Sequence, residues 1–425
     1  MGDVFQLQEP LIEGGIRSIN FFNGRLLTGG DLGREQAARR EADARLALAV
    51  GDGVAFGLEV TDGGPSPEGG LPTVRVAAGL AINRLGQTLR LTQAVQVALA
   101  RGSAAAALSN DCLFGDCAPV LGGTYVAGAG VYILALAPAE ARAGSAPTNG
   151  LDPENVRCNT DVVVSGVQLR LLAVPPSLLP GLSAAAPDYR NALAYRAFGA
   201  SVQTDWTADL LGASPRTDEL AEAMRRFGLG DADVPLALLA FTRATDLSFI
   251  DAWSVRRPLA ATDPGGLATL AGARRVAVGQ AMFRQFQDHI ASLSASGGLS
   301  AATAADLFGH LPPAGIIPTP RPSPGTNAVP AFFQGLTVRG PTYINAAEVE
   351  AVIRESLVRP PITVGDGAFI QLYRVAETDI AIDQGSVGAP KPTPFVIFAS
   401  GHLPYRSDAR FDLFRWDYAH YALQP

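Results

Sequence analysis

The sequence has few residues of the kinds that build metal sites, disulfide frameworks and nucleic-acid surfaces. Its 425 residues include three cysteines and four histidines, and Lys391 is the only lysine. The formal net charge is −7, and the arginines lie among acidic residues without forming a basic block. Proteins that bind nucleic acid through its phosphates carry a concentrated positive surface. We therefore do not expect nucleic acid as a partner.

Cysteine and histidine are too scattered to indicate a metal site. Cys112 and Cys117 lack a second pair of cysteines or histidines to complete the four ligands of a structural zinc ion. Cys158 stands apart from them. Free thiols are favoured, with one disulfide or a metal site as the alternatives. For His289, which falls inside an expected helix, a surface or interface position is favoured. We expect no metal and no cofactor.

Catalytic motifs are missing as well. The sequence has no GxSxG elbow, no P-loop and no GxGxxG between a strand and a helix. Its acidic pairs lack a spacing that would place two carboxylates in one recognisable cleft, so glycosidase chemistry is unsupported. We therefore expect a protein that is not an enzyme.

Long apolar runs are absent too. No stretch of about 18 apolar residues could form a membrane-spanning helix. Residues 1–8 lack a positive segment followed by an apolar one, which a signal peptide would need. We expect no direct membrane span and a cytoplasmic location.

The composition favours a large protein with many short elements. Its length predicts two or three domains. Charged residues make up only 17%, against about 25% in a typical protein, and glycine and proline are abundant, which suits turns and subunit contacts. We expect an α+β, multidomain fold with antiparallel β regions, inserted helices and one long helix in the second half. The expected units are an N-terminal arm and helix (1–53), a β-rich domain (54–180), a mainly helical region (181–310), a proline-rich linker (311–330) and a C-terminal α+β domain (331–425).

In the first half, residues 32–50 predict a helix with Thr28 or Asp31 as its N-cap and a stop at Gly51. A meander of short strands should follow over 73–99, with a turn at 83–86. Residues 124–136 and 161–174 predict two longer strands, which Pro175 and Pro176 terminate. We assign 138–157, between them, to a loop.

In the second half, helices are expected at 188–198, 217–227, 263–293 and 345–357, and one at 301–308 with Ser300 as its N-cap. A strand is favoured at 235–249. The prolines of 311–328 predict an extended linker. Strands are expected near 369–375 and 394–399. The arginine pairs at 39–40, 225–226 and 256–257 indicate solvated or interface surfaces.

Aromatic residues supply the interface candidates. The run Phe21-Phe22-Asn23-Gly24-Arg25-Leu26 has a short echo in Phe332-Phe333-Gln334-Gly335-Leu336, which suggests two related anchors. The C-terminal stretch combines aromatic and arginine side chains, as protein interfaces do. The interface and anchor candidates are Phe21, Phe22, Gly24, Leu26, Phe332, Phe333, His402, Tyr405, Arg410, Phe414, Arg415, Trp416 and Tyr418.

The segment 19–60 also carries a family resemblance. Its first motif, Phe21-Phe22-Asn23-Gly24-Arg25-Leu26-Leu27-Thr28, precedes a helix and then Gly57-Leu58-Glu59-Val60. This order resembles an N-terminal signature of tail-associated proteins encoded with bacterial contractile injection systems, which are phage-tail-like machines. The resemblance covers residues 19–91 and is weaker over 311–423. Gly29, Gly30 and Gly33 depart from the pattern, and each costs a helix about 1 kcal/mol relative to alanine.

The resemblance implies a structural protein of the baseplate region, cage-like or crown-like around the spike and present in several copies. Its partners would be other baseplate or tail subunits and copies of itself, within a cytoplasmic particle that could be released. Two alternatives remain open. A receptor- or glycan-binding tail protein would place His402, Tyr405 and Trp416 around a groove that binds a cell-surface glycan. A cell-wall-acting enzyme would need two facing carboxylates.

Overall fold

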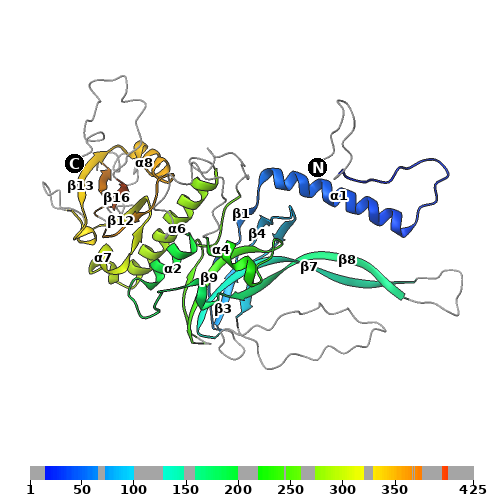
Figure 1. Ribbon diagram of the computed structural model, residues 1–425, viewed down its shortest axis with the longest axis horizontal. Helices are drawn as coiled ribbons and strands as arrows, with labels where there is room; N and C mark the ends of the chain where they lie inside the picture. Colours follow the sequence, from blue (N-terminus) through cyan, green and yellow to red (C-terminus); the bar gives the residue numbers. More distant parts are fainter. Residues whose placement is uncertain are drawn as a thin grey trace, which may run out of the picture.

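The computed structural model describes residues 15–65, 72–99, 128–147, 158–199, 219–243, 246–259, 273–319, 329–365, 367, 369–375 and 395–400. Figure 1 shows a body from which one long helix and a two-stranded ribbon project toward the right of the view. The expected α+β class is confirmed, because helices combine with several mainly antiparallel sheets. No helix in the described ranges is both long and apolar enough to cross a membrane.

The projecting helix is α1 (Gly29–Val50). Thr28 is its N-cap: the Thr28 hydroxyl accepts a hydrogen bond from the Asp31 backbone N–H at 3.2 Å, and the Asp31 carboxylate accepts one from the Thr28 N–H at 3.0 Å. This capping box satisfies two N–H groups that lack helical partners. It offsets the low helix propensity of the three glycines in the first turns. The helix ends at Gly51, as predicted.

Six short strands follow α1 and form two separate sheets. They are β1 (Gly53–Gly57), β2 (Val60–Pro65), β3 (Pro72–Val76), β4 (Gly79–Ile82), β5 (Thr88–Leu91) and β6 (Val95–Ala98). The expectation of one meander is wrong, because the strand orders are β1-β4-β5 and β2-β3-β6. The chain leaves the first sheet at Leu58, whose φ of 60° turns the backbone sharply. Where β1 meets β4, a Cβ on Gly57 would lie 2.0 Å from the Ala78 carbonyl oxygen.

A four-stranded sheet with the order β10-β9-β7-β8 forms the centre of the first half. Its strands are β7 (Gly130–Pro147), β8 (Cys158–Ala173), β9 (Val234–Arg243) and β10 (Asp246–Asp251). The single strand expected at 235–249 is therefore a hairpin. β9 and β10 also place strands inside 181–310, the segment expected to be mainly helical.

Alternate residues of this sheet face two different cores, as the period of a strand requires. Leu134 and Leu136 pack with the six short strands. Ile133 and Ala135 pack on the opposite face against helices. Those helices are α2 (Tyr189–Ala197), α4 (Leu220–Ala223) and the 3-10 helix η4 (Met224–Phe227). The helices expected at 188–198 and 217–227 are thus present, the second within the described 219–227.

The ribbon is the outer part of β7 and β8. Residues 138–147, expected to be loop, continue β7 and pair with β8 from Pro138 opposite Val167 to Pro147 opposite Cys158. The last pair between β7 and β9 is Leu136 opposite Val234. Beyond it, β8 is the only strand that pairs with β7 among the described residues, and an edge position tolerates a proline that cannot donate a hydrogen bond. The predicted end of β8 before the two prolines is confirmed, since η2 (Pro176–Leu178) follows.

The second half is built on a sheet with the order β12-β16-β15-β13, in which only β13 and β15 run parallel. On one face, Phe286 and Ile290 of the long helix α6 pack against Leu372 and Phe398. On the other face lies α8. The elements are α6 (Ala273–Ala295), η5 (Gly298–Ser300), α7 (Ala304–Leu307), β11 (His310–Leu311), β12 (Ala314–Pro318), η6 (Ala331–Phe333), β13 (Val338–Ile344), η7 (Ala346–Glu348), α8 (Val349–Ser356), β14 (Ile362–Thr363), β15 (Ile370–Val375) and β16 (Phe395–Ser400).

Two expectations for the second half are wrong. Residues 311–318, expected to belong to a linker, include most of β11 and β12, and β12 pairs with β16 from Ala314 to Pro318. β12 is an edge strand, where proline is tolerated. The short helix α7 is capped by Thr303 and not by Ser300. The helix and strands expected at 345–357, 369–375 and 394–399 are confirmed. The expected N-cap of α6, Asp263, lies outside the described residues.

The two halves meet where α2 packs against α6. Tyr195 of α2 and Phe198, the C-cap of this helix, share a core with Met282 of α6. The Asn191 side chain also forms two hydrogen bonds with the backbone of His310: its amide donates to the carbonyl at 2.9 Å and its oxygen accepts from the N–H at 3.0 Å. The body is therefore continuous across these two elements.

Candidate functional site

The predicted N-terminal anchor runs beside α1 and is held to it by polar contacts. The backbone N–H of Ile19 donates to the Glu35 carboxylate at 3.2 Å. Arg25 forms an ion pair with Asp31 at 2.9 Å. Hydrogen bonds from the Thr28 side chain and backbone, followed by those from Arg25, hold the pKa of Asp31 well below its ordinary value. The carboxylate that caps α1 therefore also fixes the segment before it.

The apolar residues of this anchor point to solvent. Phe21, Phe22 and Leu26 are 54%, 61% and 89% exposed. Gly24 has a φ of 89° and forms the turn between the aromatic pair and Arg25. The Arg25 guanidinium lies 5.8 Å from the centre of the Phe22 ring. The anchor is thus ordered by its polar groups, while its large apolar side chains contact little of their own chain.

The echo of this motif has the opposite environment. Phe332 and Phe333 are 3% and 1% exposed, in the core under α6. Their ring centres are 5.2 Å apart, and the Phe333 ring lies 5.6 Å from that of Phe398. This second pair anchors η6 within the body. The structure does not bring the two motifs together.

The ribbon exposes apolar side chains as well. Val162, Val163 and Val164 of β8 are each about half exposed. Consecutive residues of a strand point to opposite faces, so both faces of the ribbon carry valine. This surface was not predicted, because the sequence indicates a loop at 138–157 and gives no sign that the pair of strands extends outward.

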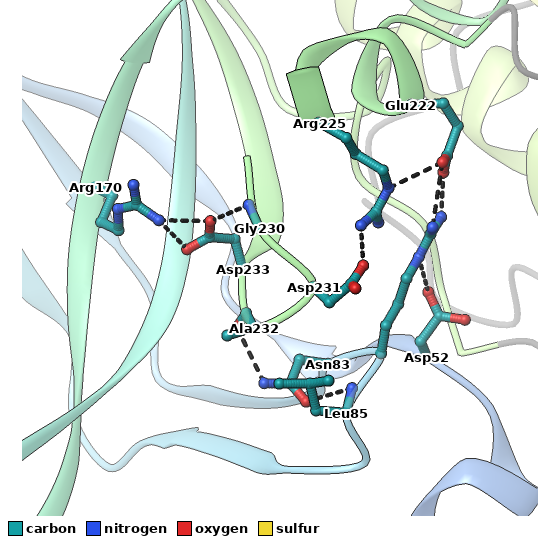
Figure 2. Close-up of polar contacts among 11 residues, drawn as sticks. Asp52, Asn83, Leu85, Arg170, Glu222, Arg225, Gly230, Asp231, Ala232 and Asp233 are labelled. Carbon is teal, nitrogen blue, oxygen red and sulfur yellow. Dashed lines mark hydrogen bonds and ion pairs between the residues drawn. The ribbon is translucent and has the colours of Figure 1, made fainter. Parts of the chain in front are cut away.

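A cluster of charged side chains lies where α1 enters the body (Figure 2). Its scaffold is the turn between β4 and β5, which the sequence predicts at 83–86. The Asn83 side chain accepts hydrogen bonds from the N–H groups of Leu85 and Gln87, at 3.1 and 2.9 Å, and donates to the Ala232 carbonyl at 3.0 Å. These bonds fix the turn against the start of β9 and orient Arg84.

Arg84 lies between two carboxylates, as Figure 2 shows. Its Nε is 3.4 Å from Asp52, directly after the end of α1, and its terminal nitrogens contact Glu222 of α4. Arg225 binds the same Glu222 at 2.9 Å and also contacts Asp231. Burial alone would raise the pKa of Glu222, but the hydrogen bonds and charges of Arg84 and Arg225 together outweigh it, so this pKa is lowered. The network ties the end of α1 to the body.

A second ion pair lies beside this network. Asp233 is buried, and its two oxygens accept from Arg170 at 2.7 and 2.5 Å. The Gly230 N–H also donates to Asp233, at 2.6 Å. Both contacts come from one terminal nitrogen of Arg170, so this charged donor and the backbone N–H together satisfy the buried carboxylate. It fixes β8 to the connection that leads into β9.

The cleft around these residues offers little room for a substrate. Its volume is about 70 Å³, which holds a few water molecules. Asp52, Glu222, Asp231 and Asp233 each pair with an arginine. The lowered pKa of Glu222 also keeps it ionised, whereas a general acid needs a raised one. This arrangement serves to join elements.

Two further expectations are corrected here. Arg225 and Arg257, expected on solvated or interface surfaces, bind carboxylates of their own chain, Arg225 at 2.9 Å from Glu222 and Arg257 at 3.2 Å from Glu219. His289, expected at a surface or interface, is buried with its ring centre 4.8 Å from that of Phe308. Burial, with a smaller contribution from the nearby Arg190 charge, lowers the pKa of His289 to about 3.

The remaining candidates lie outside the described residues. These are His402, Tyr405, Arg410, Phe414, Arg415, Trp416 and Tyr418, together with Cys112 and Cys117. Across the ranges that the structure describes, no group of three or more His, Cys, Asp or Glu residues is placed to hold a metal ion. In comparisons with known proteins, the chain matches no protein-family model and shows no significant match to a curated protein.

Proposed function

We propose that the protein is a structural subunit of a multi-copy assembly, and that it binds its neighbours through α1, the anchor before it and the β7–β8 ribbon. The observation that carries this proposal is that these two elements project from the body (Figure 1) and that their apolar side chains are exposed. Apolar side chains that are not buried in the hydrophobic cores of the body are available for contacts with other subunits.

The helix α1 has too few contacts of its own to account for its length. It has 22 residues, of which only Asp31 and Ala38 are buried. Most helical stability in proteins comes from packing of an apolar face. Leu32, Leu46 and Val50 are instead exposed. A neighbouring subunit would supply the packing that this chain lacks.

The ribbon supports the same proposal. Beyond Leu136, β7 pairs with no strand other than β8 in the part of the chain that the structure describes. A two-stranded ribbon without a sheet or helix against it is marginally stable in water. Its exposed valines would gain burial in a contact with another subunit. Because α1 and the ribbon are both weakly stabilised by their own chain and lie on one side of the body, we infer that they bind neighbouring subunits on that side.

The resemblance of residues 19–91 to tail-associated proteins specifies the assembly. We propose that the chain belongs to the baseplate region of a contractile injection system, in contact with other baseplate or tail subunits and with copies of itself. Within this proposal the charged cluster holds α1 in a fixed direction, so that each copy presents the same surface. The protein acts through binding and has no hydrolase activity.

Deletion of the gene followed by cryo-EM of the particles tests this function. We expect particles that lack density in the baseplate region, and recovery of that density when the full chain is supplied again. A matched variant with residues 138–167 replaced by a short turn keeps the body and should fail to restore the density. Particles with an unchanged baseplate in the deletion strain would contradict the proposal.

A further inference from the structure

One face of α1 carries a regular pattern that the chain itself leaves uncovered. Its positions follow one another at alternating steps of four and three residues, and all six are exposed. This spacing places them in one narrow line along a helix, as in the seam of a coiled coil. The α1 stripe consists of Leu32, Gln36, Arg39, Asp43, Leu46 and Val50.

One other face of α1 is in contact with the chain, while a further face with Ala37, Glu41 and Leu48 is exposed. Asp31 and Ala38 are buried, and Glu35 binds the backbone of the anchor. Toward the end of the helix, the backbone of Ala44 lies against the β4–β5 turn, where a Cβ on Gly86 would be 2.3 Å from the Ala44 carbonyl oxygen. The α1 stripe is one of the exposed faces of α1, and its regular spacing and its opposite charges distinguish it from the others.

The α1 stripe is complementary to itself when its direction is reversed. Leu32 then faces Val50, Gln36 faces Leu46, and Arg39 faces Asp43. Because the arrangement has two-fold symmetry, the contact between Arg39 of one helix and Asp43 of the other forms two layers. The spacing also places Arg39 and Asp43 at the two different heptad positions of the seam, d and a. In an antiparallel pair, an a position of one helix faces a d position of the other. A parallel pair would place Arg39 against Arg39 and Asp43 against Asp43, and like charges disfavour it.

We propose that α1 pairs with α1 of a second copy of this chain in antiparallel orientation, with two Arg39–Asp43 layers at the centre and Leu32–Val50 layers at the ends. This pairing rests on the proposed assembly role and names the partner of one of its surfaces. Three apolar side chains make a small contact. Several copies held in one particle would strengthen it through their high local concentration.

Charge reversal tests the pairing in the full chain. Sedimentation equilibrium over a concentration series should show reversible dimers for the wild type. Arg39→Asp and Asp43→Arg each place like charges in both central layers, and each should weaken the dimer by about tenfold. Arg40→Asp reverses a charge one residue away, about 100° around the helix, and should leave the dissociation constant unchanged.

An equimolar mixture of Arg39→Asp and Asp43→Arg chains gives the sharpest result. A mixed pair contains both layers with opposite charges, so dimers should return although each variant alone dimerises poorly. Repulsion within each helix is the same alone and in the mixture, so recovery reports contacts between chains. A monomeric wild type, single variants with unchanged affinity, or a mixture without recovery would overturn the pairing. The assembly role is tested separately, by the baseplate density of the deletion strain.

Discussion

The motifs Phe21-Phe22-Asn23-Gly24 and Phe332-Phe333-Gln334-Gly335 are nearly the same in sequence and opposite in burial. Both form a turn, and Gly24 and Gly335 have φ values of 89° and 84°. The first pair of rings lies in solvent, whereas the second lies among the rings of the core under α6. A short motif fixes its local backbone, but its burial depends on what the rest of the chain places around it.

The helices of the two regions show the same contrast. α1 and α6 have 22 and 23 residues. α6 buries Met282, Phe286 and Ile290 against the sheet and its surroundings, whereas α1 is rich in alanine and exposes its leucines. The body therefore satisfies its own apolar groups, and the N-terminal element does not. We infer that these regions differ in role, with one making the fold and the other making contacts between subunits.

The largest expected effect separates the two aromatic pairs directly. Phe333→Ala should lower the free energy of unfolding by about 3–5 kcal/mol, since it leaves a cavity among buried rings. Urea denaturation monitored by circular dichroism measures the loss. Phe22→Ala is the matched control, and we expect a change within about 0.5 kcal/mol for an exposed site. Equal losses for both variants would remove the contrast.

Acid should act on the body before it acts on the N-terminal element. The pKa of His289 is about 3 in the folded chain and 6.5 ordinarily, so below pH 6.5 the unfolded chain binds a proton that the folded chain does not. Stability should therefore fall by up to about 1.4 kcal/mol per pH unit as pH drops from 6.5 toward 3. Urea denaturation at several pH values measures this slope, and His289→Gln should flatten it.

In the N-terminal element, Asp31 should lose its contribution to stability at a lower pH than His289 does in the body. The pKa of Asp31 is lowered by folding, so its contribution is complete above about 3.8 and is lost only as pH falls further. Between pH 6.5 and 4 the hydrogen exchange of α1 should therefore report no added loss from this carboxylate. An equal acid slope in the His289→Gln variant would show that other groups govern the body.

A smaller effect is expected at the joint between β8 and β9. Asp233→Ala removes a buried carboxylate that accepts from Arg170 and Gly230, and we expect a loss of about 2 kcal/mol in urea denaturation. Asp231 pairs with Arg225 but is largely exposed. Asp231→Ala should cost less than about 1 kcal/mol. A larger loss of stability for Asp231→Ala than for Asp233→Ala would contradict the assignment of Asp233 as the buried carboxylate of the two.

The smallest effect on stability should accompany a large effect on assembly. The double variant Phe22→Ser and Leu26→Ser changes two exposed side chains, so its free energy of unfolding should stay within about 0.5 kcal/mol of the wild type. Its recovery with purified particles should fall severalfold, as quantitative mass spectrometry can measure. Normal incorporation of this variant would exclude the anchor from the subunit contacts.

Local signals in the sequence predicted much of the fold. Thr28 and Gly51 bracket α1, the turn at 83–86 separates two short strands, and Asn345 begins a helical segment, as expected. These features depend on caps and turns, which neighbouring residues determine. The sequence pattern alone predicted the fold less well where a segment is stabilised by pairing with another strand. Residues 138–147 and 314–318 contain proline and small residues. The first segment nevertheless pairs with β8, which follows β7 in the chain, and the second pairs with β16, which is distant in the sequence.

The candidate site was predicted only in part. The sequence predicts an anchor at Phe21, Phe22 and Leu26, and that role stays a prediction. Nothing in the sequence separated these exposed aromatics from the buried pair in the second half. The charged network was missed, because Arg84 and Glu222 are far apart in the chain and meet only through the fold. The turn at 83–86 was its one available signal, since it presents Arg84 to whatever lies opposite.

Hydrogen exchange of the isolated protein and of assembled particles tests the central claim most directly. We predict that the amides of 15–50 and of the outer ribbon become strongly protected in the particle, while the core strands β9, β15 and β16 exchange at the same slow rate in both. Unchanged exchange over 15–50 and the ribbon in particles that contain the protein would contradict the claim that these elements bind its neighbours.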